Sequence, residues 1–71
     1  MKIKYFTDTD TALIELGDGV IAETRELSED VYLDLDADGH VVAITLEHAS
    51  LRGDLSEFSF ARLSGNEARA V

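Results

Sequence analysis

Residues 31–46 read VYLDLDADGHVVAITL, two alternating runs on either side of a tight-turn pair. Apolar residues occupy every second position: Val31, Leu33 and Leu35 in the first run, and Val42, Ile44 and Leu46 in the second. A period of two is typical of a strand that buries one face. Asp38-Gly39 between the runs favours a two-residue hairpin turn. These residues therefore predict an antiparallel hairpin, Val31–Asp36 with His40–Leu46.

The rest of the first half of the chain divides into three more short segments with apolar alternation. They are Lys2–Phe6, Ala12–Leu16 and Val20–Leu27, separated by residues that favour turns. Parallel neighbours need a crossover of a dozen or more residues, which these short connections do not provide. We therefore predict a single antiparallel meander sheet of about five short strands, within residues 1–48.

The residues after the sheet allow two interpretations. Asp54 with Glu57 three positions later has the form of a helix N-cap with its capping-box partner. A short C-terminal helix over residues 54–63 would place Leu55 and Phe58 against the sheet, whereas Phe58-Ser59-Phe60 could equally form an extended arm. Residues 64–71 read as a flexible tail. The whole of residues 1–71 is predicted to be one α+β, mainly β, domain.

Composition limits the classes of function. Fifteen acidic residues against six basic ones give a formal charge of −9, which repels the phosphates of nucleic acid and attracts a basic protein partner. The chain has no cysteine, and neither a signal peptide nor a run of about 20 apolar residues is present. We expect a soluble, cytoplasmic protein that binds neither nucleic acid nor a membrane.

Apolar residues fall on both faces of the predicted sheet. One face would hold Ile14, Leu16, Val31, Leu33, Leu35, Val42, Ile44 and Leu46, and the other Leu13, Ile21, Leu27, Tyr32 and Val41. One short helix can cover only one of them, and a chain of this size buries a small core. The pattern predicts a homodimer, or an equivalent complex with a partner, formed through the second face or through an exchanged C-terminal segment.

The most distinctive polar motif is Asp34-Leu35-Asp36-Ala37-Asp38-Gly39, which matches the first half of an EF-hand loop. Such a loop needs a bidentate glutamate at its twelfth position, but this sequence has Thr45 there. The predicted flanks are strands, whereas an EF-hand requires helices. The simpler interpretation is a wet strand face followed by a hairpin turn. The competing hypothesis is a metal-binding or small-molecule-binding protein, or an enzyme fragment, using Asp34, Asp36, Asp38 and His40.

Other candidates for chemistry are weaker. The two histidines, His40 and His48, lack a metal-ligand spacing, and no serine stands in a Gly-x-Ser-x-Gly elbow. We assign no catalytic, cofactor-binding or metal-binding residue and expect a protein that is not an enzyme and needs no cofactor.

Four segments carry a family resemblance: residues 2–14, 20–26, 34–39 and 44–50. In order and spacing they resemble the small bacterial family called domain of unknown function 2283. Phe6 and Leu13 depart from it, standing where many members have Asp and an aromatic residue. The resemblance implies a compact β-rich fold with no established activity, in a family sometimes encoded beside small toxin-like proteins. The leading hypothesis is thus a non-enzymatic, homo-oligomeric interaction module, with an antitoxin-like role towards a basic partner as its most specific form.

Overall fold

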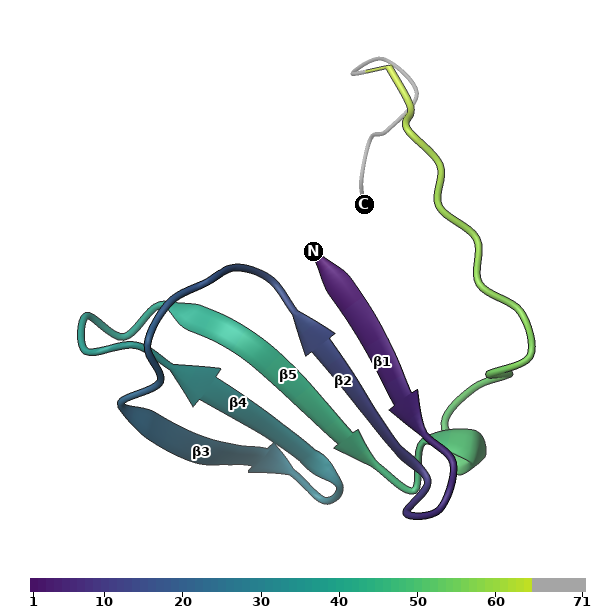
Figure 1. The fold of residues 1–71 in the computed structure, drawn as a ribbon, viewed down its shortest axis with the longest axis horizontal. Coiled ribbons are helices and arrows are strands. Elements are labelled where there is room, and N and C mark those ends of the chain that lie inside the picture. The colour runs from purple at the N-terminus through teal and green to yellow at the C-terminus, as the bar shows by residue number, and fades with distance from the viewer. Residues whose placement is uncertain (65–71) are drawn as a thin grey trace.

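The structure is a computed structural model and describes residues 1–64. One antiparallel sheet of five strands makes up the fold (Figure 1). Its strands are β1 (Lys2–Phe6), β2 (Thr11–Glu15), β3 (Glu23–Ser28), β4 (Val31–Leu35) and β5 (Val41–Glu47), and a single 3-10 turn, η1 (Ala49–Leu51), follows. The prediction of a mainly β, single-sheet fold is confirmed.

The strand order corrects the predicted meander. The order is β1-β2-β5-β4-β3, so β5 lies between the hairpin β1-β2 and the hairpin β3-β4. Residues 16–22 carry the chain past the end of β5 to the far edge, which shortens the predicted Val20–Leu27 strand to Glu23–Ser28. Backbone hydrogen bonds fasten this loop, from Leu16 N to Val42 O at 2.8 Å and from Ala22 N to Leu35 O at 2.8 Å. The prediction failed because it paired each strand with the next one in the sequence. In the structure β5, the longest strand, pairs with β2 on one side and with β4 on the other.

The predicted C-terminal helix is also wrong. Residues 54–64, here called the C-terminal arm, run extended beside β1 (Figure 1). Asp54 does accept hydrogen bonds as a cap would, from the Ser56 amide at 2.9 Å and the Ser56 hydroxyl at 2.6 Å, but the turn is not continued. Helices shorter than about 12 residues need tertiary packing for stability, and this segment lies too far from the sheet to receive it. The predicted tail, residues 64–71, lies beyond the described residues except for Ser64.

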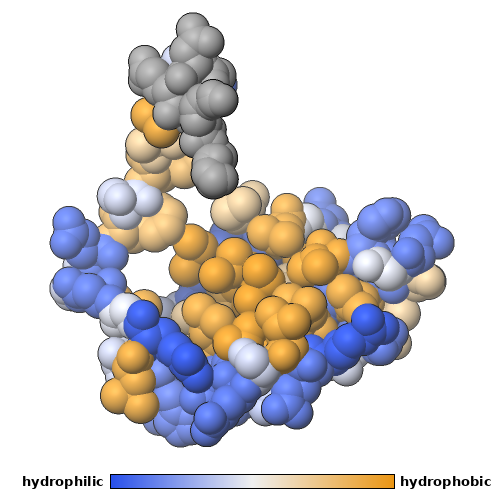
Figure 2. Space-filling view, turned by 180° about the vertical axis from the view of Figure 1, so that it is seen from behind, coloured by the Kyte–Doolittle hydropathy of each residue, from blue (hydrophilic) through white to orange (hydrophobic). Residues whose placement is uncertain are grey.

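The register separates the side chains into two unlike faces, because antiparallel partners point the same way. One row across the sheet is Ile3, Ile14, Ile44 and Leu33, and the next is Tyr5, Ala12, Leu46 and Val31. With Leu16, Leu35 and Val42 these rows form what we call the apolar face, which is the face seen in Figure 2. The eight residues predicted to share a face all lie on it.

The opposite face, called the polar face, is built from the alternate positions of the same strands. Its rows are Lys2, Glu15, Ala43, Asp34 and Thr24, then Lys4, Leu13, Thr45, Tyr32 and Glu26. Leu13 and Tyr32 are therefore on this face as predicted, but charged and hydroxyl-bearing neighbours surround them. The surface that lacks a cover is the first predicted face, because the helix expected to cover it is absent.

Burial is slight throughout the described residues. Only Ala12, Leu35, Val42, Ala43 and Ala49 are buried, and three of these five are alanines. A single sheet layer has no second layer against which its long side chains can pack. The larger side chains of the apolar face are therefore half-buried by their own neighbours and open to solvent above. Within residues 1–64, no helix has the length and hydrophobicity of a bilayer-crossing segment.

Candidate functional site

The predicted acidic and histidine group is brought together only in part. Ligand atoms of Asp36, Asp38 and His40 lie within 4.8 Å of one another at the β4-β5 turn. Asp34 stands apart on the polar face, where its Oδ1 accepts a hydrogen bond of 2.7 Å from the Thr24 hydroxyl. Three of the four candidate residues thus form one cluster, and the fourth belongs to a cross-strand pair.

Asp36 has a structural task in this cluster. Its Oδ1 accepts hydrogen bonds from the backbone amides of Asp38 and His40, both at 2.9 Å, and its Oδ2 lies 3.5 Å from His40 Nδ1. The amide bonds, that of His40 foremost, lower the pKa of Asp36 below its ordinary value. Gly39, at a φ of 86°, closes the turn in a conformation that favours glycine. The cluster therefore serves as a turn stabiliser, with two carboxylates and an imidazole that a metal ion could share.

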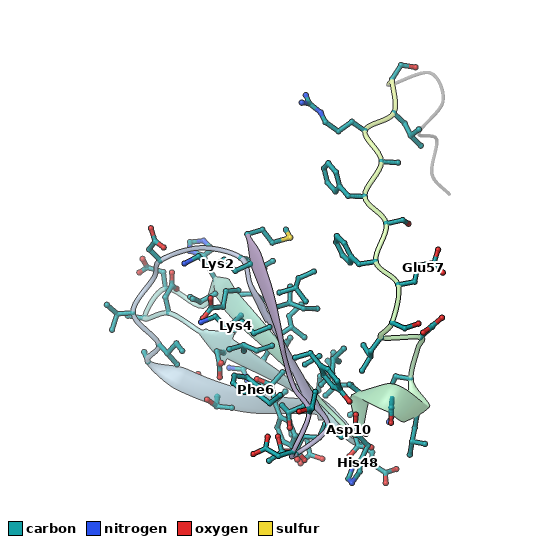
Figure 3. The ribbon with its side chains drawn as sticks, turned by 45° about the vertical axis from the view of Figure 1, so that its right-hand side comes forward. Lys2, Lys4, Phe6, Asp10, His48 and Glu57 are labelled. Atoms are coloured by element: carbon teal, nitrogen blue, oxygen red, sulfur yellow. The ribbon has the colours of Figure 1, made fainter. Side chains whose placement is uncertain are left out.

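A second polar group lies at the opposite end of the sheet, where three loops meet, and we call it the loop cluster. It comprises Tyr5, Asp10, Asp30, His48, Ser50 and Arg52. Figure 3 shows Asp10 and His48 together beside η1. The resemblance segments contained four of these residues, but sequence periodicity could not show that their loops converge.

Asp10 is the centre of one half of the loop cluster. Its Oδ1 accepts hydrogen bonds from the Tyr5 hydroxyl at 2.6 Å and the Ser50 amide at 3.0 Å, and its Oδ2 accepts one from the Ser50 hydroxyl at 2.7 Å. The backbone of Asp10 also accepts a bond of 2.9 Å from the Ala49 amide. The bonds from Tyr5 and then Ser50 lower the pKa of Asp10, while the carboxylate raises the pKa of Tyr5. Asp10 therefore fastens η1 to the β1-β2 hairpin.

Asp30 performs the same task for the β3-β4 hairpin. Its Oδ1 lies 3.1 Å from His48 Nδ1, its Oδ2 lies 3.4 Å from an Arg52 guanidinium nitrogen, and its backbone oxygen accepts a bond of 2.8 Å from the Glu47 amide. The hydrogen bond with His48 lowers the pKa of Asp30 and raises that of His48. The contact therefore favours the charged form of both groups.

Backbone geometry fits a structural role for the loop cluster. Asp10, Asp30 and His48 adopt positive φ values of 56°, 68° and 53°, a region that Asp and His enter more readily than most residues. The Ser50 hydroxyl is bonded to a carboxylate, and the His48 imidazole to a different one, so the two do not form a nucleophile-base pair. The arrangement joins three loops, as hydrogen-bonding side chains in turns commonly do.

The apolar face is the larger candidate for binding. Hydrophobic side chains gather over its centre with no layer above them (Figure 2). At its β1 edge, Ile3, Tyr5 and Ala12 face Leu55, Phe58 and Phe60 of the C-terminal arm across an open groove of about 610 Å³. Contiguous exposed apolar surface on a small protein is characteristic of an interaction site.

Comparison with family models supports the sequence resemblance. The model described as Protein of unknown function (DUF2283) matches residues 2–50. The match includes all five strands, the Asp10 and Asp30 loops and the start of η1. The comparisons with curated proteins and with solved structures each give no match. Since the matched segment is well over half of the 71 residues, the chain belongs to the DUF2283 family.

Proposed function

We propose that this protein is a non-enzymatic interaction module that works as a homodimer, with the apolar faces of two copies packed together. The observation that carries the proposal is the uncovered apolar face, whose rows of Ile, Leu and Val side chains have no second layer. Stable domains consist of at least two packed layers, and a second copy supplies the missing one. Self-association requires no other protein, and the second copy presents an apolar face with the same chemistry as the face that it covers.

The distribution of charge is also compatible with self-association. A formal charge of −9 opposes the approach of a second copy, but the charged pair on the apolar face, Glu23 and Arg25, is self-neutralising at 3.0 Å. Among residues 1–64, the other acidic residues lie on the polar face, in the turns or, as Asp54 and Glu57, on the C-terminal arm. Two apolar faces can therefore meet without bringing uncompensated carboxylates together.

Sedimentation velocity from about 1 µM to 1 mM, combined with thermal melts at the same concentrations, tests the dimer. We expect a shift from monomer to dimer and a melting midpoint that rises with concentration, because association stabilises the folded chain by mass action. A monomer throughout the range with a constant midpoint would refute the proposal.

The most specific form of the proposal adds a basic protein partner, in an antitoxin-like role. Self-association through the apolar face would leave the acidic polar face and turns outward, which favours encounter with a basic surface. Affinity purification in low salt, followed by a salt wash, tests this form. We expect a basic protein that elutes between about 0.2 and 0.5 M salt, where surface attraction is screened. Recovery of no such partner would remove this form and leave the dimer untouched.

A metal-binding role is the second candidate, and the cluster of Asp36, Asp38 and His40 within 4.8 Å favours it. A bound ion must raise the melting midpoint, because it stabilises the folded chain by an amount that grows with the logarithm of the ratio of ion concentration to dissociation constant. Titration with Zn²⁺ and with Ca²⁺, in wild type and in Asp38→Asn, decides the matter. A rise in the midpoint that Asp38→Asn removes would establish the site, and equal curves for both proteins would exclude it.

A further inference from the structure

The groove between the apolar face and the C-terminal arm is lined mainly by apolar side chains, with Glu57 among them on the arm, and no other described residue fills it. On the arm, Phe58 and Phe60 are 71% and 77% exposed, and on the sheet Ile3 is 46% exposed. The groove measures about 610 Å³, so it is large enough for several side chains. Figure 3 shows the arm standing clear of the side chains of the sheet. Exposed aromatic rings beside an exposed apolar edge indicate a missing packing partner.

We propose that this groove receives the C-terminal arm of a second copy, so that two chains exchange their arms at the β1 edges. The inference rests on the proposed dimer, because it specifies which segments the two copies exchange. In a two-fold dimer, each contact of one arm with the partner's sheet is repeated by the other arm. Each arm thus leaves its own β1 edge and packs against the β1 edge of the partner.

The sequences of the arm and of β1 match position by position. β1 is an edge strand with β2 as its neighbour, so its other backbone edge is available for an added strand. The arm alternates as β1 does, polar then apolar: Glu57, Phe58, Ser59 and Phe60 against Lys2, Ile3, Lys4 and Tyr5. An added strand in this phase places both rings on the apolar face and Glu57 on the polar face near two lysines. Opposite charges on neighbouring strands are stabilising.

A second copy suits this groove better than the chain's own arm. Even if the own arm folded back onto β1, its two rings would span only the β1 edge of a face that is five strands wide. Strands lie about 4.8 Å apart, so most of that face stays open whichever way the arm folds. A second copy covers the face and the groove together.

Isotope-filtered NMR on a mixture of ¹³C-labelled and unlabelled full-length protein tests the exchange directly. We expect intermolecular contacts between the rings of Phe58 and Phe60 and the methyl groups of Ile3 and Ala12. The same contacts seen only within one chain would overturn the proposal, as would their absence from a sample that is dimeric by sedimentation. A sample that stays monomeric would refute the proposed dimer and this exchange with it.

Paired variants provide an independent measurement. Replacing Phe58 and Phe60 together by serine should raise the dimer dissociation constant at least about tenfold per ring, given the apolar area that each ring would bury. Leu63→Ser is the control, since Leu63 is an exposed arm residue that does not line the groove. Circular dichroism checks that both proteins keep the sheet. An unchanged dissociation constant in the double variant, with the wild type dimeric, would overturn the exchange alone.

Discussion

The two faces of the sheet are built from the same strands, but a single chain provides suitable surroundings for the side chains of the polar face only. On the polar face, Lys4 and Glu15 form an ion pair at 3.4 Å, and Thr24 and Asp34 share a hydrogen bond of 2.7 Å. Water can solvate whatever remains there. On the apolar face, neighbouring side chains cover the apolar groups only in part. Water does not stabilise the exposed remainder, because apolar groups gain stability only when they are removed from water. This difference is the reason why we propose the apolar face as the contact surface of the molecule.

Adjacent positions on β5 allow the sharpest test of this difference. Ile44 lies on the apolar face and Thr45 on the polar face, and both sit at the centre of the strand. We expect Ile44→Asp to abolish self-association and to destabilise the fold by more than about 3 kcal/mol, because it would place a carboxylate in an apolar contact. Thr45→Asp should change stability by less than about 1 kcal/mol. Chemical denaturation and sedimentation measure both, and equal effects would contradict the assignment of the faces.

The loop that carries the chain across the sheet end allows a second comparison, between two glycines. A Cβ at Gly19 would lie 3.0 Å from a Val42 methyl group, whereas one at Gly17 would meet nothing within 4 Å. We expect Gly19→Ala to cost about 1 to 3 kcal/mol through overpacking. Gly17→Ala should be neutral or stabilise by up to about 1 kcal/mol through the unfolded state. Urea denaturation of both variants tests this, and equal stabilities would show that the loop does not pack on β5.

The loop cluster can be compared with an exposed residue in the same turn. Asp10→Ala removes the acceptor for Tyr5 and Ser50, so it should lower the melting midpoint clearly below that of Asp8→Ala. The melting midpoint of Asp10→Asn should lie between those of the two alanine variants, because asparagine tolerates the positive φ and keeps one acceptor oxygen. If Asp8→Ala were as harmful as Asp10→Ala, the loop cluster would not be what fastens η1.

The smallest expected effect is a pH dependence. The bond to Asp30 raises the pKa of His48 above 6.5 in the folded state, so the stability from this pair is fully present below pH 6.5. It is lost as the pH rises through the folded-state pKa. The bond to His48 lowers the pKa of Asp30 below 3.8, so the contribution also fades as the pH falls through that lower value.

Melting curves of wild type and His48→Asn between pH 5 and pH 9 measure this contribution. We expect the melting midpoint of the wild type to exceed that of the variant most below pH 6.5. The gap between the two midpoints should narrow above pH 6.5. Asparagine tolerates the positive φ of His48, which limits the change to the ionic pair. Asp30→Asn should narrow the same gap, and a gap independent of pH would show that the pair is not ionic.

Much of the secondary structure could be predicted because strand alternation is a local property. The β4-β5 hairpin follows from Val31 to Leu46, where the pattern is strict and Asp38-Gly39 defines the turn. The N-terminal strand was predicted with its observed bounds, Lys2–Phe6. The start of β3 was misplaced because the alternation around Val20 and Ile21 does not distinguish a strand from a crossing loop.

The candidate sites were less predictable, since each depends on loops that meet in space. The β4-β5 turn was found because Asp36, Asp38 and His40 are close in sequence. The loop cluster was missed because Asp10 and Ser50 are 40 positions apart. Sequence spacing carries information about neighbours within one turn or one strand, and none about which loops converge.

The amino-acid sequence by itself determined which residues form strands and which of them share a face, because side chains alternate along any extended backbone. Only the tertiary structure decided that β5 lies between β2 and β4, that the C-terminal arm stays extended, and that the loops of Asp10 and Asp30 meet at η1. Those outcomes depend on competition between distant segments for the same hydrogen-bonding edges and the same apolar surface. The periodicity of a short segment carries no information about that competition.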